Sequence, residues 1–377
     1  MQEGRSFNTL FEGYPGTVSR GELSNGKEIE LRPISLGDQY NIDDSAEAMF
    51  ASCNGTGKIP GTDCRMTGFD KEQSHGGPKY PEYVYVNHED TKPYFAMAHE
   101  WVVGDKMFAS QLDGDYVAHQ YVIAAQAGRA VGIPDGQPWG CDAPGGTTIG
   151  TLTDKRTFGP FESPCFDYQT LGAELESVGL SWRYYTSTYD GTPYFSIKGF
   201  LGSPGSKKHI VTPQKRFFSD VAAGKLANFT WITPPCPDSD RSSCGGGYGP
   251  SWVAALVNTV GKSKFWDSTA IFVQWADWGG FYDNAPPPYK NFDSLGFRVP
   301  LLVISPYAKH DYVSHVQYET ASVLRFAEDI YALPHMAAAD RRATSPAVDC
   351  FDFSQKPRTF VRIPAPKSEK FFMHQHD

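Results

Sequence analysis

The stretch Ala270-Ile-Phe-Val-Gln-Trp275 is short, apolar and rich in β-branched and aromatic residues, and Val299-Pro-Leu-Leu-Val-Ile304 has the same character. Runs of this kind are typical of strands that are buried on both faces of a sheet. Segments with a helical pattern lie between them, which favours an α/β fold with a mostly parallel central sheet and helices on both faces. The expected strands are 181–186, 228–233, 270–275 and 299–304, and the expected helices are 168–178, 215–223, 251–258 and 319–330.

The rest of the chain is less regular. Helical patterns occur at 95–103 and 115–126, and Asp115 is a suitable N-cap for the second. Gly, Pro, Asp and Asn are frequent at 8–93 and 130–165, which predicts long loop insertions there.

The composition indicates a folded domain without a nucleic-acid or membrane role. Of the 377 residues, 40% are hydrophobic and 20% are charged, and 34 Lys and Arg against 43 Asp and Glu give a net charge of −9. No run of basic residues builds the surface that nucleic acid requires, and no apolar run approaches the ~18 residues of an integral membrane segment. We expect one domain over 1–363 and a flexible tail over 364–377. The composition does not predict the oligomeric state.

The cysteines indicate an oxidising compartment. Near pairs of cysteines in Gly-, Pro- and Asp-rich loops are typical of local disulfides in a secreted or periplasmic protein. The alternatives are free thiols in a reducing compartment and a zinc site, but the chain has no C-x-x-C motif and no His close to the pairs. The pairs are Cys53 with Cys64, Cys141 with Cys165, and Cys236 with Cys244, which leaves Cys350 over.

The loops that follow the predicted strands contain the candidate functional residues. In open α/β sheets, ligands bind outside the carboxyl ends of the strands. The loops concerned are 275–283 with Asp277, 233–241 with Arg241, and 305–315 with His315.

Several motifs together resemble one family. Gln2-Glu3-Gly4-Arg5-Ser6-Phe7 resembles a Gln-Glu-Asn-Arg-Ser-Phe opening, and 275–283 resembles Asp-Asp/Glu-x-Gly-Gly-Phe-Tyr-Asp. Residues 296–306, Val313-Ser-His315 and Leu324-Arg-Phe-Ala-Glu328 resemble the C-terminal part of the same family. This is the phosphoesterase family of bacterial phospholipases C and acid phosphatases, whose fold is alkaline-phosphatase-like. The resemblance implies a phosphoric ester hydrolase that acts on a small phosphate ester or a phospholipid head group.

The resemblance also implies a divalent metal ion of unknown identity. In the family, acidic side chains hold the metal, a Ser or Thr at a helix N-terminus attacks phosphorus, and histidines bind phosphate or protonate the leaving alcohol. Glu3 and Asp277 match acidic positions of the family, and with Asp115 as a replacement for the missing carboxylate they are the expected metal ligands. Asp115, His119, Arg241 and His315 are the expected catalytic residues.

Several positions depart from the family pattern. Asp115 stands where relatives have Ser or Thr, and it is open whether it is a helix cap, a third metal ligand or an aspartyl nucleophile. His119 lies in a largely apolar helix, where a buried structural role is the alternative. Arg241 could hold an anion but could not transfer a proton as a His does. The remaining departures are Gly4 for Asn, Ala276 for an acid and Ala46 for a His. The alternative function is therefore a degenerate family member that binds an anionic or phosphorylated ligand without turnover.

The start of the chain is a further departure. In relatives an apolar strand delivers the opening motif to the site, whereas only Met1 and Gln2 precede Glu3 here. We expect that strand, and a signal peptide, upstream of the sequence shown.

Overall fold

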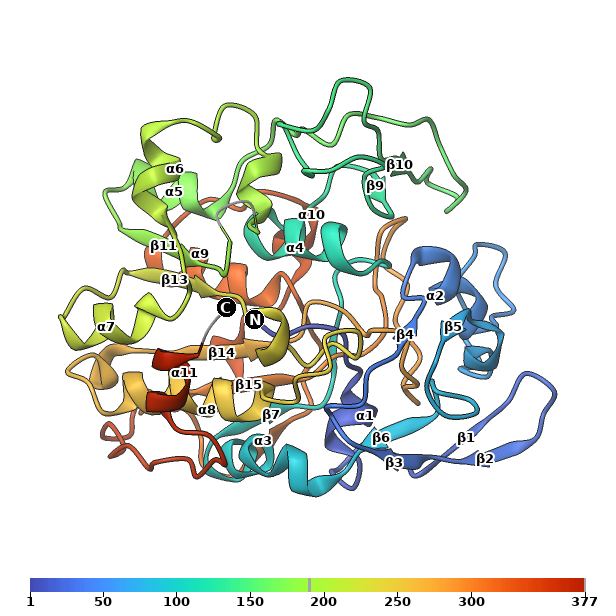
Figure 1. Cartoon of the computed structure of the whole chain (residues 1–377), viewed down its shortest axis with the longest axis horizontal. Helices are drawn as coiled ribbons and strands as arrows, with labels where there is room; N and C mark the ends of the chain where they lie inside the picture. Colours follow the sequence, from blue (N-terminus) through green and yellow to red (C-terminus); the bar gives the residue numbers. More distant parts are fainter. Residues whose placement is uncertain (189–190, 376–377) are drawn as a thin grey trace.

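The computed structural model describes residues 1–188 and 191–375 and has the α/β architecture expected from the sequence (Figure 1). One sheet has the strand order β12-β11-β13, and a larger one has the order β14-β15-β7-β16. Their bounds are Trp182–Tyr185 for β11, Ile210–Val211 for β12, Phe229–Ile232 for β13, Ile271–Gln274 for β14, Leu301–Ile304 for β15, Val102–Gly104 for β7 and Tyr312–Ser314 for β16.

Most of these pairings are parallel, and β15 is the exception. β12 and β13 both run parallel to β11, and β16 runs parallel to β7. β15 is antiparallel to both β14 and β7. A parallel partner needs a long crossover, usually a helix. Residues 275–300 contain no helix, so β15 follows β14 as an antiparallel neighbour.

Among residues 1–188 and 191–375, Met1 and Gln2 lie between β13 and β14. The amino group of Met1 donates to Ile232 O at 2.8 Å, and Gln2 forms a parallel bridge with Trp275. Figure 1 shows the N-terminus between these strands. Behind it, a largely apolar cavity of about 560 Å³ is lined by both strands.

Helices cover both faces of the sheets, as predicted. Tyr184 and Tyr185 are neighbours on β11 and belong to two different core clusters. The first cluster packs α4, α5 and α9 against β11 and β13, and the second includes α7 and α8. On the larger sheet, α3 and α8 share a core with β7, β14 and β15. The bounds are His88–Glu100 for α3, Asp115–Ala124 for α4, Leu171–Ser177 for α5, Arg216–Ala222 for α7, Gly249–Gly261 for α8 and Ser322–Tyr331 for α9.

The prediction of a helix over 95–103 is wrong at its C-terminal end. α3 ends at Glu100, and Val102 and Val103 belong to β7 in the middle of the larger sheet. They pair with β15 on one side and with β16 on the other. Two adjacent β-branched residues with strand partners on both sides favour this extended conformation over the last turn of a helix.

The remaining helices and strands are short, and many of them lie in the loop-rich regions. They are α1 Phe7–Phe11, β1 Arg20–Glu22, β2 Glu28–Glu30, β3 Arg32–Ile34, β4 Asn41–Ile42, α2 Ala46–Cys53, β5 Ser74–His75, β6 Val84–Val86, β8 Met107–Phe108, β9 Ala130–Val131, β10 Gly150–Thr151, α6 Pro204–His209, β17 Tyr318–Glu319, α10 Ala338–Arg342 and α11 Glu369–His374.

The segment expected as a flexible tail contains a packed helix. α11 lies against α8, and Phe372 is only 2% exposed. Lys262 Nζ at the end of α8 pairs with Glu369 Oε1 at 2.7 Å. The buried Phe372 side chain anchors the segment. The described part of 364–377 is therefore packed, and is not the flexible tail that the sequence predicts.

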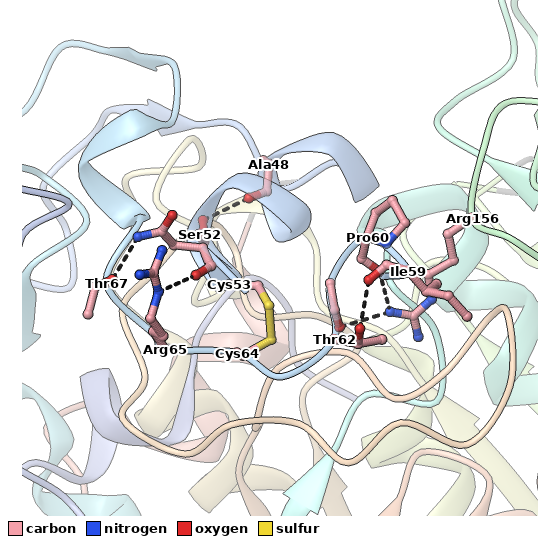
Figure 2. Close-up of a disulfide and its surroundings, with 12 residues drawn as sticks. Ala48, Ser52, Cys53, Ile59, Pro60, Thr62, Cys64, Arg65, Thr67 and Arg156 are labelled. Atoms are coloured by element: carbon pink, nitrogen blue, oxygen red, sulfur yellow. Dashed lines mark hydrogen bonds between the residues drawn. A yellow bond between two sulfur atoms is a disulfide. The ribbon is translucent and has the colours of Figure 1, made fainter. Parts of the chain in front are cut away.

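Three disulfides join the predicted pairs of cysteines, and Cys350 is a buried free cysteine. Figure 2 shows the Cys53–Cys64 disulfide, which ties the end of α2 to the loop that follows it. The buried guanidinium of Arg156 supports the same loop by donating to Pro60 O at 3.0 Å. Within the described ranges, no helix has the length and apolar character needed to cross a membrane.

Candidate functional site

The N-terminal segment brings Glu3 to the carboxyl ends of β13 and β14. Gln2 N donates to Gln274 O and Gln2 O accepts from Ala276 N, which fixes the backbone beside β14. The Gln2 side chain donates to Asp238 O at 2.9 Å and accepts from Asp240 N at 3.0 Å. One residue thereby holds the loop after β13 and the loop after β14 on either side of Glu3.

Glu3 forms an ion pair with His119 of α4. The distance between Glu3 Oε1 and His119 Nε2 is 3.0 Å, and Ser239 Oγ donates to Glu3 Oε2 at 3.1 Å. Burial alone would raise the pKa of Glu3, but the hydrogen bond and charge of His119 and the charge of Arg241 lower it to about 2. Glu3 is therefore a carboxylate, and His119 is a partner of this site rather than a purely apolar core residue.

Asp240 anchors the loop that carries Arg241. Its Oδ2 accepts from Tyr94 Oη at 2.7 Å and from Trp275 Nε1 at 2.9 Å, and its side chain is fully buried. Burial raises the pKa of Asp240 to about 6, although these two donors act in the opposite direction. The backbone of Arg241 therefore starts from a fixed point.

Arg241 is the cation around which the acidic side chains gather. Its Nη2 donates to Asp115 Oδ2 at 2.9 Å while Nη1 pairs with Asp115 Oδ1, so the contact is bidentate. The same Nη2 lies 3.2 Å from Asp44 Oδ2. Burial would lower the pKa of Arg241, but the charges of Asp44, Asp277 and Glu3 raise it. A bidentate Arg–carboxylate contact is among the stronger charge-assisted pairs in proteins.

Asp115 is the first residue of α4, and the structure corrects the expectation that it is the N-cap. The cap is Gly114, which makes no side-chain bond, and the Asp115 carboxylate faces Arg241 instead. Asp115 has φ of +38°, a left-handed conformation that is uncommon outside Gly and Asn or Asp. A Cβ on Gly114 would lie 2.7 Å from Asp44 Oδ2, so glycine allows Asp44 to approach the start of α4.

Asp277 completes the acidic cluster and has a second carboxyl group, that of Asp44, as a neighbour. Its Oδ1 accepts from Gly279 N at 3.0 Å, and its side chain is hydrogen-bonded to Asp44. Two carboxyl groups can share a hydrogen bond only if one of them holds a proton. Burial, followed by the charge of Asp44, raises the pKa of Asp277 to about 7, with Arg241 opposing, and burial likewise raises the pKa of Asp44.

Asp113 positions the elements behind the site. Its carboxylate accepts from Gly132 N at 2.7 Å, Gly114 N at 2.9 Å and Ala46 N at 3.4 Å. These contacts join the start of α2, the start of α4 and the loop after β9. Asp44 and Asp115 lie within two residues of these contacts, so Asp113 fixes the spacing between them.

His315 is not brought into contact with this cluster. It follows β16, on the far side of the larger sheet, and its Nδ1 lies 2.7 Å from Asp105 Oδ2. Its side chain is 65% exposed. The ion pairs and charge interactions described above link the other predicted site residues to one another. These residues are Glu3, Asp115, His119, Arg241 and Asp277.

The donor set does not fit the metal ion that the family resemblance implies. Among residues 1–188 and 191–375, no group of three or more His, Cys, Asp or Glu side chains is arranged to hold a metal ion. Asp115 and Asp44 both face the guanidinium of Arg241, and Glu3 faces His119. Two of the three expected ligands, Asp115 and Glu3, thus already face a basic side chain of the chain itself.

Sequence reasoning missed three residues of the site. Asp44 lies in Asp43-Asp44-Ser45-Ala46, where the family resemblance points to a His at the position of Ala46 and not to the acid two residues before it. Gln2 and Asp240 occur within recognised motifs, and their buried polar side chains hold the loops together. A polar residue that flanks a motif residue at the end of a buried strand is the available signal for such a role.

Comparisons with known proteins agree with the motifs. The sequence model of the Phosphoesterase family matches residues 1–334. Phospholipase C A of Mycobacterium tuberculosis (strain H37Rv) is 22% identical over 327 residues, covering 76% of this chain and 60% of the relative. Non-hemolytic phospholipase C of Pseudomonas aeruginosa is 23% identical, covering 94% and 56%, and non-specific phospholipase C1 of Arabidopsis thaliana is 28% identical, covering 84% and 61%. The chain spans about 60% of the length of these relatives.

Solved structures give a more distant match. A protein in the alkaline phosphatase superfamily from Vibrio parahaemolyticus aligns with 86% of this chain and 68% of its own, at a TM-score of 0.36 and 12% sequence identity.

Proposed function

Since this chain belongs to the phosphoesterase family, we propose that it hydrolyses phosphate esters at the site formed by Arg241, Asp115, Glu3 and His119. The observation that carries the proposal is the bidentate contact between Arg241 and Asp115 at the first turn of α4. It provides a fork of donors beside the position from which the family resemblance implies attack on phosphorus.

Arg241 is the proposed phosphate-binding group. A phosphate presents two oxygens to a guanidinium in the same way as a carboxylate does. The Asp115 side chain is 35% exposed, whereas that of Asp44 is 15% exposed, so Asp115 is the partner that a substrate displaces more easily. Binding of substrate then frees the Asp115 carboxylate next to phosphorus.

The proposed reaction has two steps. A carboxylate oxygen of Asp115 attacks phosphorus, the bond from phosphorus to the alcohol oxygen breaks, and that oxygen takes a proton from His119, which Glu3 orients. Water then attacks the aspartyl phosphate, the bond from phosphorus to the Asp115 oxygen breaks, and the proton of the water returns to the Glu3–His119 pair. No step uses a metal ion, because Asp115 faces Arg241 and Glu3 faces His119 rather than a shared metal position.

The proposed substrates are small phosphate esters or phospholipid head groups. Support comes from the relatives, which are phospholipases C. Three disulfides support a secreted or periplasmic location, since such bonds persist in oxidising compartments.

The test is release of p-nitrophenol from p-nitrophenyl phosphate and from p-nitrophenylphosphorylcholine, with added divalent metal and with EDTA. We expect release above the buffer rate that survives EDTA and falls about 100-fold or more in Arg241→Ala and Asp115→Asn. Arg20→Ala is the matched control, because Arg20 is exposed and pairs with Glu30 far from the site. No release by the folded protein would refute the hydrolase.

A second candidate function is binding of an anionic or phosphorylated ligand without turnover. The specific observation in its favour is that Asp115, in place of Ser or Thr, has both carboxylate oxygens occupied by Arg241. Under this function, calorimetry detects binding of inorganic phosphate or phosphorylcholine that Arg241→Ala removes, while no p-nitrophenol appears. Turnover above buffer excludes it.

A further inference from the structure

The acidic cluster contains its own cation. Asp44 and Asp115 contact the guanidinium of Arg241, and the charges of Asp277 and Glu3 act on it as well. The contacts come from separate parts of the chain, since Asp44 precedes α2, Asp115 begins α4 and Arg241 follows β13. A surface arginine would not collect carboxylates from two elements so far apart in the chain. The guanidinium is a built part of the site.

We propose that Arg241 is a built-in replacement for a divalent metal ion, so that the native site binds no divalent cation and removal of the guanidinium creates a metal site from Asp44, Asp115 and Asp277. The inference concerns the same site as the proposed hydrolase and rests on the proposed function only for its biological meaning. The charge arrangement that carries it is independent of turnover.

Charge balance is the first argument. Asp44 and Asp115 each bring a carboxylate, and so a negative charge, into contact with the guanidinium of Arg241. The guanidinium neutralises one of these charges and cannot lose its proton. A divalent ion within about 4 Å of it would meet a like-charge repulsion, which the low effective dielectric of a protein strengthens relative to water.

Geometry is the second argument. A metal ion would have to remove Asp115 from a bidentate contact and Asp44 from a hydrogen bond before either could act as a ligand. Arg241 has little freedom to leave, because its backbone N–H donates to Ser239 Oγ at 3.2 Å and the preceding Asp240 is fully buried. Metal binding to the native site therefore competes with interactions that already satisfy the ligands.

The test is equilibrium dialysis of the whole chain against Mn²⁺, followed by metal analysis of the protein. We expect no stoichiometric Mn²⁺ on the native protein, and about one equivalent on Arg241→Ala, bound about tenfold or more tighter than by the native protein. Arg241→Ala combined with Asp277→Asn should lose the added metal, because one of the new ligands is gone. Arg20→Ala, the matched arginine deletion, should bind no more than the native protein.

Two results would overturn the inference. One is a stoichiometric Mn²⁺ on the native protein that Asp277→Asn removes, a measurement that needs no arginine variant to fold. The other is a folded Arg241→Ala, shown by circular dichroism, that gains no Mn²⁺. Neither depends on activity, so failure of the hydrolase assay and failure of the metal measurement are separate outcomes.

Discussion

Gly4 has no side chain at the point where the stem of Arg241 passes. A Cβ on Gly4 would lie 3.1 Å from Arg241 Cγ and 3.2 Å from Arg241 Cα, and Gly4 has φ of +65°. The sequence departs from the family resemblance at both positions, and the structure shows that the two departures touch. A larger residue at position 4 would compete for the space that the arginine occupies.

The contact predicts a coupling between the two positions. Gly4→Ala should destabilise the native protein through its left-handed backbone and through the crowded Cβ, and the second part should shrink when Arg241 is also changed to Ala. We expect a coupling energy of about 0.5–1 kcal/mol in a double-mutant cycle measured by urea unfolding. Gly179→Ala is the control, because Gly179 has φ of +76° and open space around it. The coupling would be contradicted if Gly4→Ala cost the same stability with and without Arg241→Ala, as is expected for Gly179→Ala.

Arg156 predicts a large loss of stability when its guanidinium is removed. It is 2% exposed and donates to Gly61 O at 2.9 Å, Phe292 O at 2.9 Å and Ser294 O at 2.7 Å. Because Arg156→Met leaves these carbonyls without donors, we expect a cost of about 3 kcal/mol in urea unfolding.

The matched control for Arg156→Met is Arg65→Met, in the same part of the molecule. Arg65 is exposed and donates to Asn54 O at 2.7 Å (Figure 2). Arg65→Met should change the free energy of unfolding by no more than about 0.5 kcal/mol. Similar losses for the two variants would show that the buried carbonyl contacts of Arg156 are not what stabilises the loops.

The strands were predictable because apolar, β-branched runs leave little choice of environment. The runs at 270–275 and 299–304 correspond to β14 and β15. The direction of β15 was missed, although residues 275–300 lack the helical pattern that a parallel crossover needs. The local pattern at 95–103 predicts a helix that includes Val102 and Val103. It cannot indicate their strand partners, because β15 and β16 are distant in sequence.

The candidate site was predictable as a set of residues but not as a set of contacts. Motif positions identified Glu3, Arg241 and Asp277, and their charges do interact in the structure. The partner of each side chain depends on the geometry of loops far apart in the chain. Asp115 illustrates the limit, since its residue type allows a cap, a ligand or a nucleophile, and only the fold places Arg241 against it.

The buried Glu82 is expected to make the folded protein less stable as the pH rises. Burial, with a smaller contribution from the charge of Asp70, raises the pKa of Glu82 from 4.5 to about 7, although its own backbone amide opposes this. Between these values the folded state holds a proton that the unfolded state has released, so stability is lost as pH rises through 7. Glu82→Gln mimics the protonated form, and we expect it to gain about 2 kcal/mol over the native protein at pH 8 compared with pH 4.5.

Urea unfolding at the two pH values measures this effect. Glu28→Gln is the matched control, because Glu28 is an exposed residue of β2. Its difference from the native protein should be the same at both pH values. A Glu82→Gln difference that is equally independent of pH would rule out Glu82 as a source of the pH dependence.

The cavity between β13 and β14 predicts that a designed strand can stabilise the fold. Met1 and Gln2 already make the first contacts with Ile232 and Trp275, which sets the direction and register of such a strand. Burial lowers the pKa of the Met1 amino group from 8.0 to about 5, so the folded state binds fewer protons than the unfolded state between these values. This group therefore costs stability as the pH falls from 8 to 5, and any extension converts it to a neutral amide.

Two designed extensions fused before Met1 separate the effect of the strand from the effect of the charge. One consists of five alternating Val and Ile residues and the other of five Gly and Ser residues. Both remove the buried amino group, but only the first can pair with β13 and β14 and fill the 560 Å³ cavity with apolar side chains. After the entropy cost of ordering the strand, we expect the apolar extension to be more stable by about 1–3 kcal/mol in urea unfolding at pH 8. Equal stability of the two fusions would mean that the space between β13 and β14 does not accept a strand, and that the two sheets are held together by their helices alone.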